Sequence, residues 1–406
     1  MQHGQRGSFQ LMKSLNRAII LNKIRIHGPI SRADIAKETT LTPPTVSNIV
    51  KELIETGLVI ETTQGESKGG RKPTLLVINA DSFYIIGVDI GPKVIRIIIT
   101  DLTGTIINSN TKEIPTPLTN KQLIEVVKTE IRQLLHMYPN SLEKFIGIGV
   151  GMHGMVDVAN GVSLFAPSLG LKDIPIKTVL EEEFYMTVLV ENDARVMALG
   201  ESWFGKGNEG DNTITINVGQ GIGAGIVIDG NLFHGDHYIA GEIGHMTIDI
   251  SGVRCSCGNY GCLETVAAGP AIAQRAKREI SIGKESILRS MVNNDLSKIT
   301  GKLVHEAAKK GDSLSIAVLR ETGLYLGIGL TNLIHIINPK RIVIGGGVSK
   351  AGDFVLQSIR ETIQNRALTK AAKETEIVIS DFGDYGTAIG AVTLVLDYLF
   401  SASQSE

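Results

Sequence analysis

The sequence predicts an α/β protein that carries a winged helix-turn-helix domain at its N-terminus. The chain is 406 residues long, which is more than one hydrophobic core usually supports. Residues 1–80 hold 11 of the 40 basic and 6 of the 42 acidic side chains, so a basic head precedes an acidic body. After residue 80, apolar strands that end in glycine-rich turns alternate with helices, which is the pattern of α/β folds.

The elements of the head follow from spacing and capping residues. Apolar residues at helical spacing predict a first helix over residues 9–27. Ser31 is expected to cap a short helix over residues 32–39. Thr42 precedes a further helix that opens on two prolines and stops at Gly57. Two short helices joined by a tight turn are the helix-turn-helix pattern.

The second of these two short helices is predicted to bind the major groove of DNA. Its exposed polar side chains, which reach base edges and phosphates, are Thr42, Thr45, Ser47, Asn48 and Lys51. Strands over residues 58–62 and 75–78 form a hairpin, or wing, with a basic tip. There Arg71 is expected in the minor groove, with Lys68 and Lys72 on phosphates. The alternative is a winged helix used only for protein contacts.

Several strands of the body lead into turns that can present backbone amides to a ligand. These strands cover residues 84–91, with a hairpin partner at 94–101, and residues 145–150, 187–190, 213–218 and 341–344. Glycine-rich turns follow three of them, which favours a nucleotide or sugar site. The last apolar stretch, residues 388–400, has the spacing of an amphipathic helix and is expected to return to the first part of the body.

All three cysteines lie close together in the sequence. Cys255, Cys257 and Cys262 follow His245 on one short segment, and these four side chains are the donor set of a tetrahedral zinc site. The alternative is a disulfide with one spare thiol. We favour structural zinc, because the number of cysteines is odd and the sequence shows neither a signal peptide nor a membrane-spanning run. These features predict a cytoplasmic, reducing location.

Six motifs together resemble the ROK family (repressors, open reading frames and sugar kinases). They are Asp89-Ile90-Gly91, Glu191-Asn192-Asp193-Ala194, Gly219-Gln220-Gly221-Ile222-Gly223, Gly241-Glu242-Ile243-Gly244-His245, the cysteine run ending in Leu263-Glu264, and Asn338-Pro339 with Gly345-Gly346-Gly347. The resemblance covers the whole chain and includes the winged-helix head of the repressor branch, such as the xylose, glucose and N-acetylglucosamine repressors.

The resemblance implies a two-lobed, actin-like ATPase fold after the head. Residues 81–192, with about 388–406, would form the smaller lobe. Residues 193–387 would form the larger lobe, which holds the zinc site and the dimer surface. Similar proteins are homodimers or tetramers built from two dimers.

The resemblance also implies which residues contact a sugar. These are Asn192, Asp193, Glu242, His245 and Glu264. Carboxylates and amides suit paired hydrogen bonds to sugar hydroxyls, and His245 would bind zinc through one ring nitrogen and the sugar through the other. The alternatives are a helix cap for Asp193 and a solvated helix start for Glu264. Ser168 stands where the family frequently has asparagine, so the identity of the sugar stays open.

Asp193 stands where the family's kinases carry their general base. On the ATP side, however, Pro92 removes an amide donor, Lys93 replaces a hydroxyl, and Gln220 stands where threonine is usual. The sequence therefore favours a sensor without enzymatic activity, in which Asp193 is a vestigial base.

The resulting prediction is a sugar-responsive repressor of carbohydrate-utilisation genes. It would sense xylose or a related aldose and bind a palindromic operator as a dimer. One alternative is an ATP-dependent sugar kinase with a DNA-binding head. Another is a repressor released by a partner protein. The sign of the sugar response is not determined by the sequence.

Overall fold

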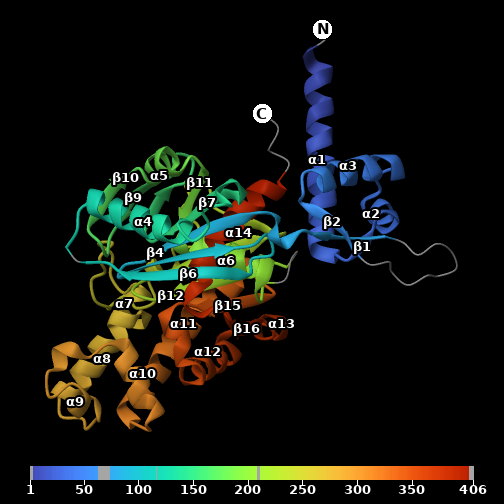
Figure 1. The fold of residues 1–406 in the computed structure, drawn as a ribbon. Coiled ribbons are helices and arrows are strands. Elements are labelled where there is room, and N and C mark those ends of the chain that lie inside the picture. Colours follow the sequence, from blue (N-terminus) through green and yellow to red (C-terminus); the bar gives the residue numbers. More distant parts are fainter. Residues whose placement is uncertain (1–2, 63–73, 116, 208–210, 402–406) are drawn as a thin grey trace.

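The computed structural model describes residues 3–62, 74–115, 117–207 and 211–401. Within these ranges a head stands beside a larger body, as Figure 1 shows. The predicted basic tip of the wing, with Lys68, Arg71 and Lys72, lies outside the described residues.

The described helices and strands alternate through the body. The α-helices are α1 (His3–His27), α2 (Arg32–Thr39), α3 (Pro43–Glu55), α4 (Asn120–Leu135), α5 (Ile176–Phe184), α6 (Asp193–Phe204), α7 (Glu264–Ala267), α8 (Gly269–Ser281), α9 (Leu288–Met291), α10 (Gly301–Lys309), α11 (Ser313–Ile337), α12 (Asp353–Arg366), α13 (Lys370–Lys373) and α14 (Gly386–Phe400). The strands are β1 (Ile30–Ser31), β2 (Val59–Thr62), β3 (Leu75–Ile78), β4 (Tyr84–Ile90), β5 (Val94–Thr100), β6 (Ile106–Glu113), β7 (Phe145–Met152), β8 (Met155–Asp157), β9 (Val162–Ala166), β10 (Leu171–Ile174), β11 (Thr187–Asn192), β12 (Thr213–Val218), β13 (Ile222–Ile228), β14 (Asn231–Phe233), β15 (Arg341–Gly345) and β16 (Glu376–Ile379).

The head has the predicted winged helix-turn-helix arrangement. The Ser31 hydroxyl accepts a hydrogen bond from the Asp34 amide at 3.2 Å and so caps α2, and Thr42 caps α3 in the same way. Strands β2 and β3 form the wing, and the short strand β1 adds to its edge. We did not predict β1, because two residues are too few for a periodic pattern. Helix α1 also begins earlier than predicted, at His3.

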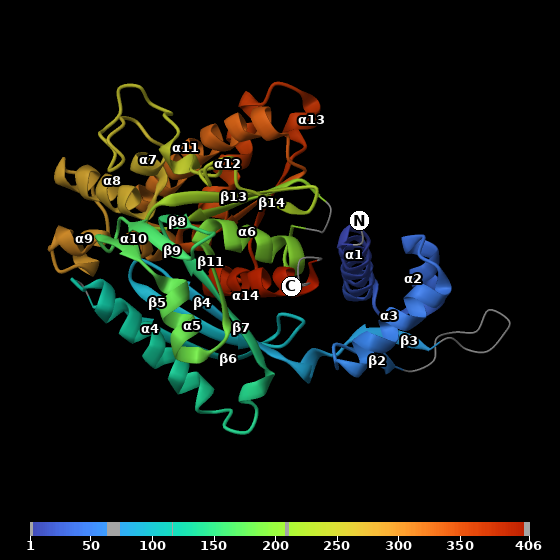
Figure 2. The ribbon, with the colours of Figure 1, turned by 90° about the horizontal axis from the view of Figure 1, so that it is seen from above.

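Two five-stranded sheets form the frame of the body. The first has the order β11-β7-β4-β5-β6, in which β4 runs antiparallel to β5 and parallel to β7. The second has the order β14-β13-β12-β15-β16. Figure 2 shows α4 and α5 beside the first sheet, α11 and α12 beyond the second, and α6 and α14 in the middle of the body. The third sheet, β10-β9-β8, is small.

Helix α14 returns to the first sheet and packs on β7, β4 and α6. It begins at Gly386, and its residues 386–393 are all buried. The expectation of an amphipathic helix is therefore wrong for this half, because the sheet and α6 cover the helix on more than one side.

One of the three hydrophobic cores joins the head to the body. Ile20 and Ile24 of α1 belong to the same buried cluster as Leu102, Leu396 and Phe400 of the body. Each of the other two cores contains buried residues of one large sheet and of the helices packed against it. Helix α14 therefore contributes to the core that the body shares with the head.

Candidate functional site

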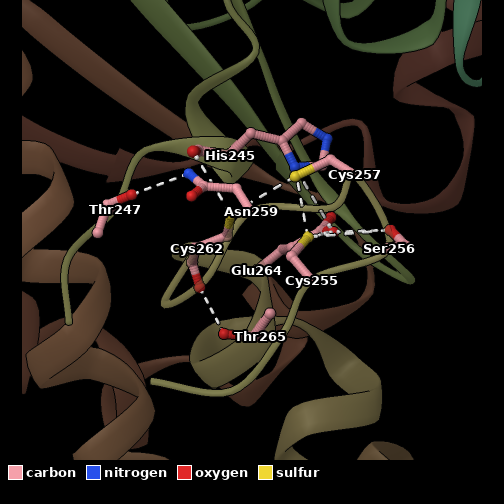
Figure 3. Close-up of polar contacts among 9 residues, drawn as sticks. All are labelled: His245, Thr247, Cys255, Ser256, Cys257, Asn259, Cys262, Glu264 and Thr265. Atoms are coloured by element: carbon pink, nitrogen blue, oxygen red, sulfur yellow. Dashed lines mark hydrogen bonds and ion pairs between the residues drawn. The ribbon is translucent and has the colours of Figure 1, made fainter. Parts of the chain in front are cut away.

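The predicted metal ligands meet in space. The ligand atoms of His245, Cys255, Cys257 and Cys262 all lie within 4.8 Å of one another. The Sγ atoms of Cys257 and Cys262 are 3.7 Å apart, and Cys255 Sγ lies 3.6 Å from His245 Nδ1. In a tetrahedral zinc site, sulfur–sulfur and sulfur–nitrogen edges are about 3.6–3.8 Å long. The four side chains in Figure 3 therefore form a cluster that fits a tetrahedral metal ion.

Tight backbone turns bring the cysteines together. The Cys255 amide donates to the Asn259 carbonyl at 2.7 Å, which folds the segment back on itself. Gly258 and Gly261 both have positive φ, and a Cβ at Gly261 would lie only 1.6 Å from the Asp249 carbonyl oxygen. The two glycines allow a fold that other residues at these positions would strain.

Glu264 lies directly against the metal cluster. Its Oε1 atom accepts a hydrogen bond from the Cys255 thiol at 2.9 Å and lies 3.7 Å from His245 Nδ1. Only 19% of its side chain is exposed, so it is not a solvated helix start. Its other carboxylate oxygen faces the glycine turn at Gly221. Glu264 therefore links the metal cluster to this turn.

Asn192 and Asp193 have different roles at the start of α6. The Asn192 Oδ1 atom accepts hydrogen bonds from the amides of Ala194 and Arg195 at 3.0 and 3.2 Å, so Asn192 is the helix cap. Its Nδ2 atom donates to the Gly154 carbonyl. The capping alternative for Asp193 is therefore wrong, because Asn192 is the cap and Asp193 is the first residue of α6. The Asp193 carboxylate instead accepts a hydrogen bond from Asn217 of β12 at 3.0 Å.

Four of the five predicted sugar-contacting residues, Asp193, Glu242, His245 and Glu264, interact electrostatically. Burial raises the pKa of Glu242, and the nearby charge of Arg195 opposes that rise, as His245 does when protonated. The negative charges of Asp193 and Glu264 also act on Glu242 and raise its pKa further. Carboxylates from three separate segments therefore influence one another electrostatically. A surface pocket along α12, lined by Asp353, Gln357, Arg360, Glu361, Gln364 and Asn365, includes none of them.

Asp193 makes stability depend on pH. Asp193 is half-buried, and desolvation by the surrounding protein raises its pKa from 3.8 to about 6, against the hydrogen bond from Asn217. The folded state therefore binds this proton more tightly than the unfolded state. The resulting stabilisation is complete below about pH 4 and is lost as the pH rises through 6. We expect the melting temperature of Asp193→Asn to rise relative to that of the unmodified protein between pH 4 and pH 7. Thermal denaturation across this range measures the difference, and a constant difference would contradict the assignment.

A buried ion pair supports the site, and its role was not predicted. Arg195 Nε lies 2.9 Å from Glu191 Oε1 without the alignment of a hydrogen bond, and both side chains are at most 2% exposed. The second Glu191 oxygen contacts His234 Nε2 at 2.8 Å. Arg195 also donates to the Tyr238 carbonyl at 2.6 Å. These contacts hold the segment that leads to Glu242. Glu191 was visible in its sequence motif, but its partner His234 lies 43 residues away.

The position that resembles the ATP phosphate side carries a chain of ion pairs. Arg96 donates to the Asp89 carboxylate at 3.1 Å and lies 3.6 Å from Asp384, which also pairs with Lys350 at 2.7 Å. Burial raises the pKa of Asp89 to about 7, against the opposing charge of Arg96. The carboxylate of Asp89 is therefore paired with the guanidinium group of Arg96.

The predicted DNA-contacting face of α3 is available to solvent. Ser47, Asn48 and Lys51 are exposed, while Val46 and Ile49 on the opposite face are buried. Thr42 and Thr45 are joined by a hydroxyl–hydroxyl hydrogen bond of 2.8 Å at the start of the helix. Lys51 is 76% exposed, and it lies 3.7 Å from Glu55 on the same helix.

Comparisons with known proteins cover both parts of the chain. The sequence profile of the ROK family matches residues 85–398, and that of the MarR family matches residues 14–71. The chain is 34% identical over 395 residues to the xylose repressor of Caldicellulosiruptor bescii. This alignment covers 97% of this chain and 98% of that protein.

Solved structures agree with this similarity. A crystal structure of a ROK family transcriptional regulator, a homologue of the E. coli MLC protein, matches with a TM-score of 0.84 at 31% identity. The match covers 97% of this chain and 98% of that one. A ROK family glucokinase from Streptomyces griseus, in complex with glucose and AMPPNP, matches 77% of this chain and 98% of its own with a TM-score of 0.70 at 30% identity. No helix among the described residues is long and apolar enough to cross a membrane.

Proposed function

This chain belongs to the ROK family, and from that premise we propose that it is a sugar-responsive transcriptional repressor that binds operator DNA. Its relatives include a named xylose repressor, which supports control of carbohydrate-utilisation genes by xylose or a related aldose. The observation that carries the proposal is the head: a winged helix-turn-helix whose second short helix buries its apolar face and exposes its polar one.

In the proposed complex, α3 lies in the major groove. Ser47 and Asn48 hydrogen-bond to base edges, Lys51 neutralises a phosphate, and Thr42 and Thr45 lie at the helix start beside the backbone. The basic tip of the wing, Lys68, Arg71 and Lys72, reaches the neighbouring minor groove and its phosphates. Two heads in a dimer would meet two half-sites about one helical turn or a multiple of it apart.

The proposed effector site lies where the carboxylates gather. Asp193, Glu242 and Glu264 accept hydrogen bonds from the hydroxyls of one sugar, and the free amide hydrogen of Asn192 donates one. We assign residues 81–192 and the C-terminal helix to a smaller lobe and residues 193–387 to a larger one. The sugar then contacts both lobes and favours their closure, which shifts the relative placement of two heads.

Zinc is the ion we propose for the cluster of three cysteines and one histidine. Four protein donors complete its tetrahedral coordination, so the metal has a structural role. The metal fixes the orientation of His245 through Nδ1, and the remaining ring nitrogen, Nε2, hydrogen-bonds the sugar. The ion thus supports the site and takes part in no chemical step.

We propose that the chain has no kinase activity, although the ROK family includes the glucokinase described above. Phosphoryl transfer needs backbone amides, hydroxyls and magnesium around the phosphates of ATP. In this chain Pro92 lacks an amide hydrogen, and the Asp89 carboxylate accepts a hydrogen bond from Arg96. Both features support a site that binds sugar without transferring a phosphoryl group.

Operator binding and its release test the proposal directly. We expect the protein to bind DNA from its own upstream region and to lose affinity on addition of xylose, glucose or N-acetylglucosamine. Asn48→Ala should weaken specific binding by about 1–3 kcal/mol and relax sequence preference at one position. Fluorescence anisotropy at fixed salt measures both effects, because phosphate contacts make affinity salt-dependent.

Three other results would contradict the proposal. Absence of specific DNA binding would remove the repressor function. Formation of ADP from ATP, magnesium and any of these sugars would favour a kinase. Release of DNA by a partner protein, with no effect of any sugar, would transfer the effector role to that partner. Lys121→Ala on the surface of α4 is a control that should behave like the unmodified protein.

A further inference from the structure

Two adjacent helices run from the interior of the body to the head. Helix α6 begins at Asp193, one of the carboxylates of the proposed sugar site, and ends at Phe204. Its 12 residues span about 18 Å. Helix α14 packs along it and ends at Phe400. Figures 1 and 2 both show the C-terminal end of α14 directed toward α1 of the head. The two helices therefore connect the proposed sugar site with the head.

The far ends of both helices meet one arginine of the head. The Arg25 guanidinium lies 3.7 Å from the centroid of the Trp203 ring on α6 and 5.9 Å from that of Phe400 on α14. The two rings pack edge to face at 5.8 Å. Asn22 donates to the Phe400 carbonyl at 3.2 Å and accepts a hydrogen bond from Arg25 at 3.3 Å. This is a cation–π contact reinforced by a hydrogen bond between head and body.

Glycines bring the two helices into backbone contact. A Cβ at Gly200 would lie 2.9 Å from the Cα of Gly390, and a Cβ at Gly390 would lie 1.9 Å from the Val196 carbonyl oxygen. No side chain separates the helices at this crossing, so a change in the packing of one helix acts directly on the backbone of the other.

We infer that Arg25 and Trp203 are positioning residues that transmit sugar binding to the DNA-binding head. The inference rests on the proposed function and specifies how that site acts. Sugar bound at Asp193 displaces the start of α6, and the stiff helix carries the shift to Trp203. The contact with Arg25 then reorients α1, which packs on α2 and α3. The coupling is reciprocal, so operator DNA also changes the affinity for sugar by the same factor.

The unmodified protein already contains a probe for this contact. Trp203 is the only tryptophan in the chain, so intrinsic tryptophan fluorescence reports on its surroundings alone. Xylose, glucose and N-acetylglucosamine are tested as effectors. We expect the sugar that releases operator to change this fluorescence. The sugar concentration that gives half of the fluorescence change should equal the dissociation constant measured by calorimetry. Unchanged fluorescence at saturation by a sugar that releases DNA would overturn the inference.

Arg25→Gln separates coupling from binding. The measured quantity is the ratio of operator dissociation constants with and without saturating sugar. We expect Arg25→Gln to bind both operator and sugar while this ratio falls by roughly two- to thirtyfold, the range of a lost cation–π contact. Trp203→Phe keeps a ring but weakens the contact, so it should fall in between.

Lys23→Gln is the matched control. It removes one positive charge from the same helix, but Lys23 pairs with Glu38 at 2.9 Å inside the head. Its ratio should equal that of the unmodified protein. An unchanged ratio in Arg25→Gln would overturn the inference and leave the proposed function standing. An unmodified protein that binds no operator, or that no sugar releases, would overturn the proposed function itself.

Discussion

Cys257→Ser is expected to release the metal and abolish the response to sugar together. Cys257 is one of four donors in the cluster, and the change replaces a thiolate by a weak ligand. We expect metal affinity to fall at least about 100-fold, since even indirect changes around such sites cost 10–100-fold. Without the ion, the side chains of His245 and Glu264 are no longer held in one orientation. Sugar affinity is therefore expected to fall together with metal content.

Binding to operator in the absence of sugar should survive this change, because the head has its own helices and wing far along the chain from the cluster. The expected variant is therefore a repressor that no sugar releases. Metal analysis, calorimetry with sugar and operator anisotropy measure the three effects. Ser251→Ala, in the same exposed segment, is the control. Full sugar binding by metal-free Cys257→Ser would disprove the link through His245.

Glu191→Ala is expected to lower the free energy of unfolding by about 3–5 kcal/mol. The change leaves Arg195 buried without its carboxylate partner, and both side chains are at most 2% exposed. It also removes the acceptor of His234 and of the Asn192 amide. Chemical denaturation followed by circular dichroism measures the loss.

A double variant and a control test whether the lost stability comes from the unpaired buried charge of Arg195. Glu191→Ala combined with Arg195→Leu removes both charges, so much of the lost stability should return. Glu55→Ala breaks the exposed pair with Lys51 and should change stability by less than about 1 kcal/mol. A loss below about 1 kcal/mol in Glu191→Ala would show that Arg195 does not depend on Glu191.

Local signals in the sequence predicted the head well. Ser31 caps its helix as expected, because capping depends on residues within one turn. The α3 helix begins at the two prolines that follow Thr42, as predicted, and Thr42 caps it. The wing strands were also found, since each follows a short apolar run. The two-residue strand β1 was missed, because only its pairing with β3 makes it a strand.

The candidate site was only partly predictable. His245 and the cysteines were found because they share one short segment, and the structure confirms that their donor atoms converge. The contact between Glu264 and Cys255 was not foreseen, although both lie in the same motif. Arg96 and His234 were missed altogether, because their carboxylate partners are reached only when strands and loops pack together.

The sequence alone determined the family resemblance, the approximate bounds of the elements of the head and of several strands of the body, and the set of metal donors, because each depends on residues close together in the chain. Only the tertiary structure showed that α14 is buried on several sides and that one core joins it to the head. The contact of Arg25 with Trp203 joins residues that are 178 positions apart. Spacing along a chain carries no information about such contacts, because they arise only when separate helices fold against each other.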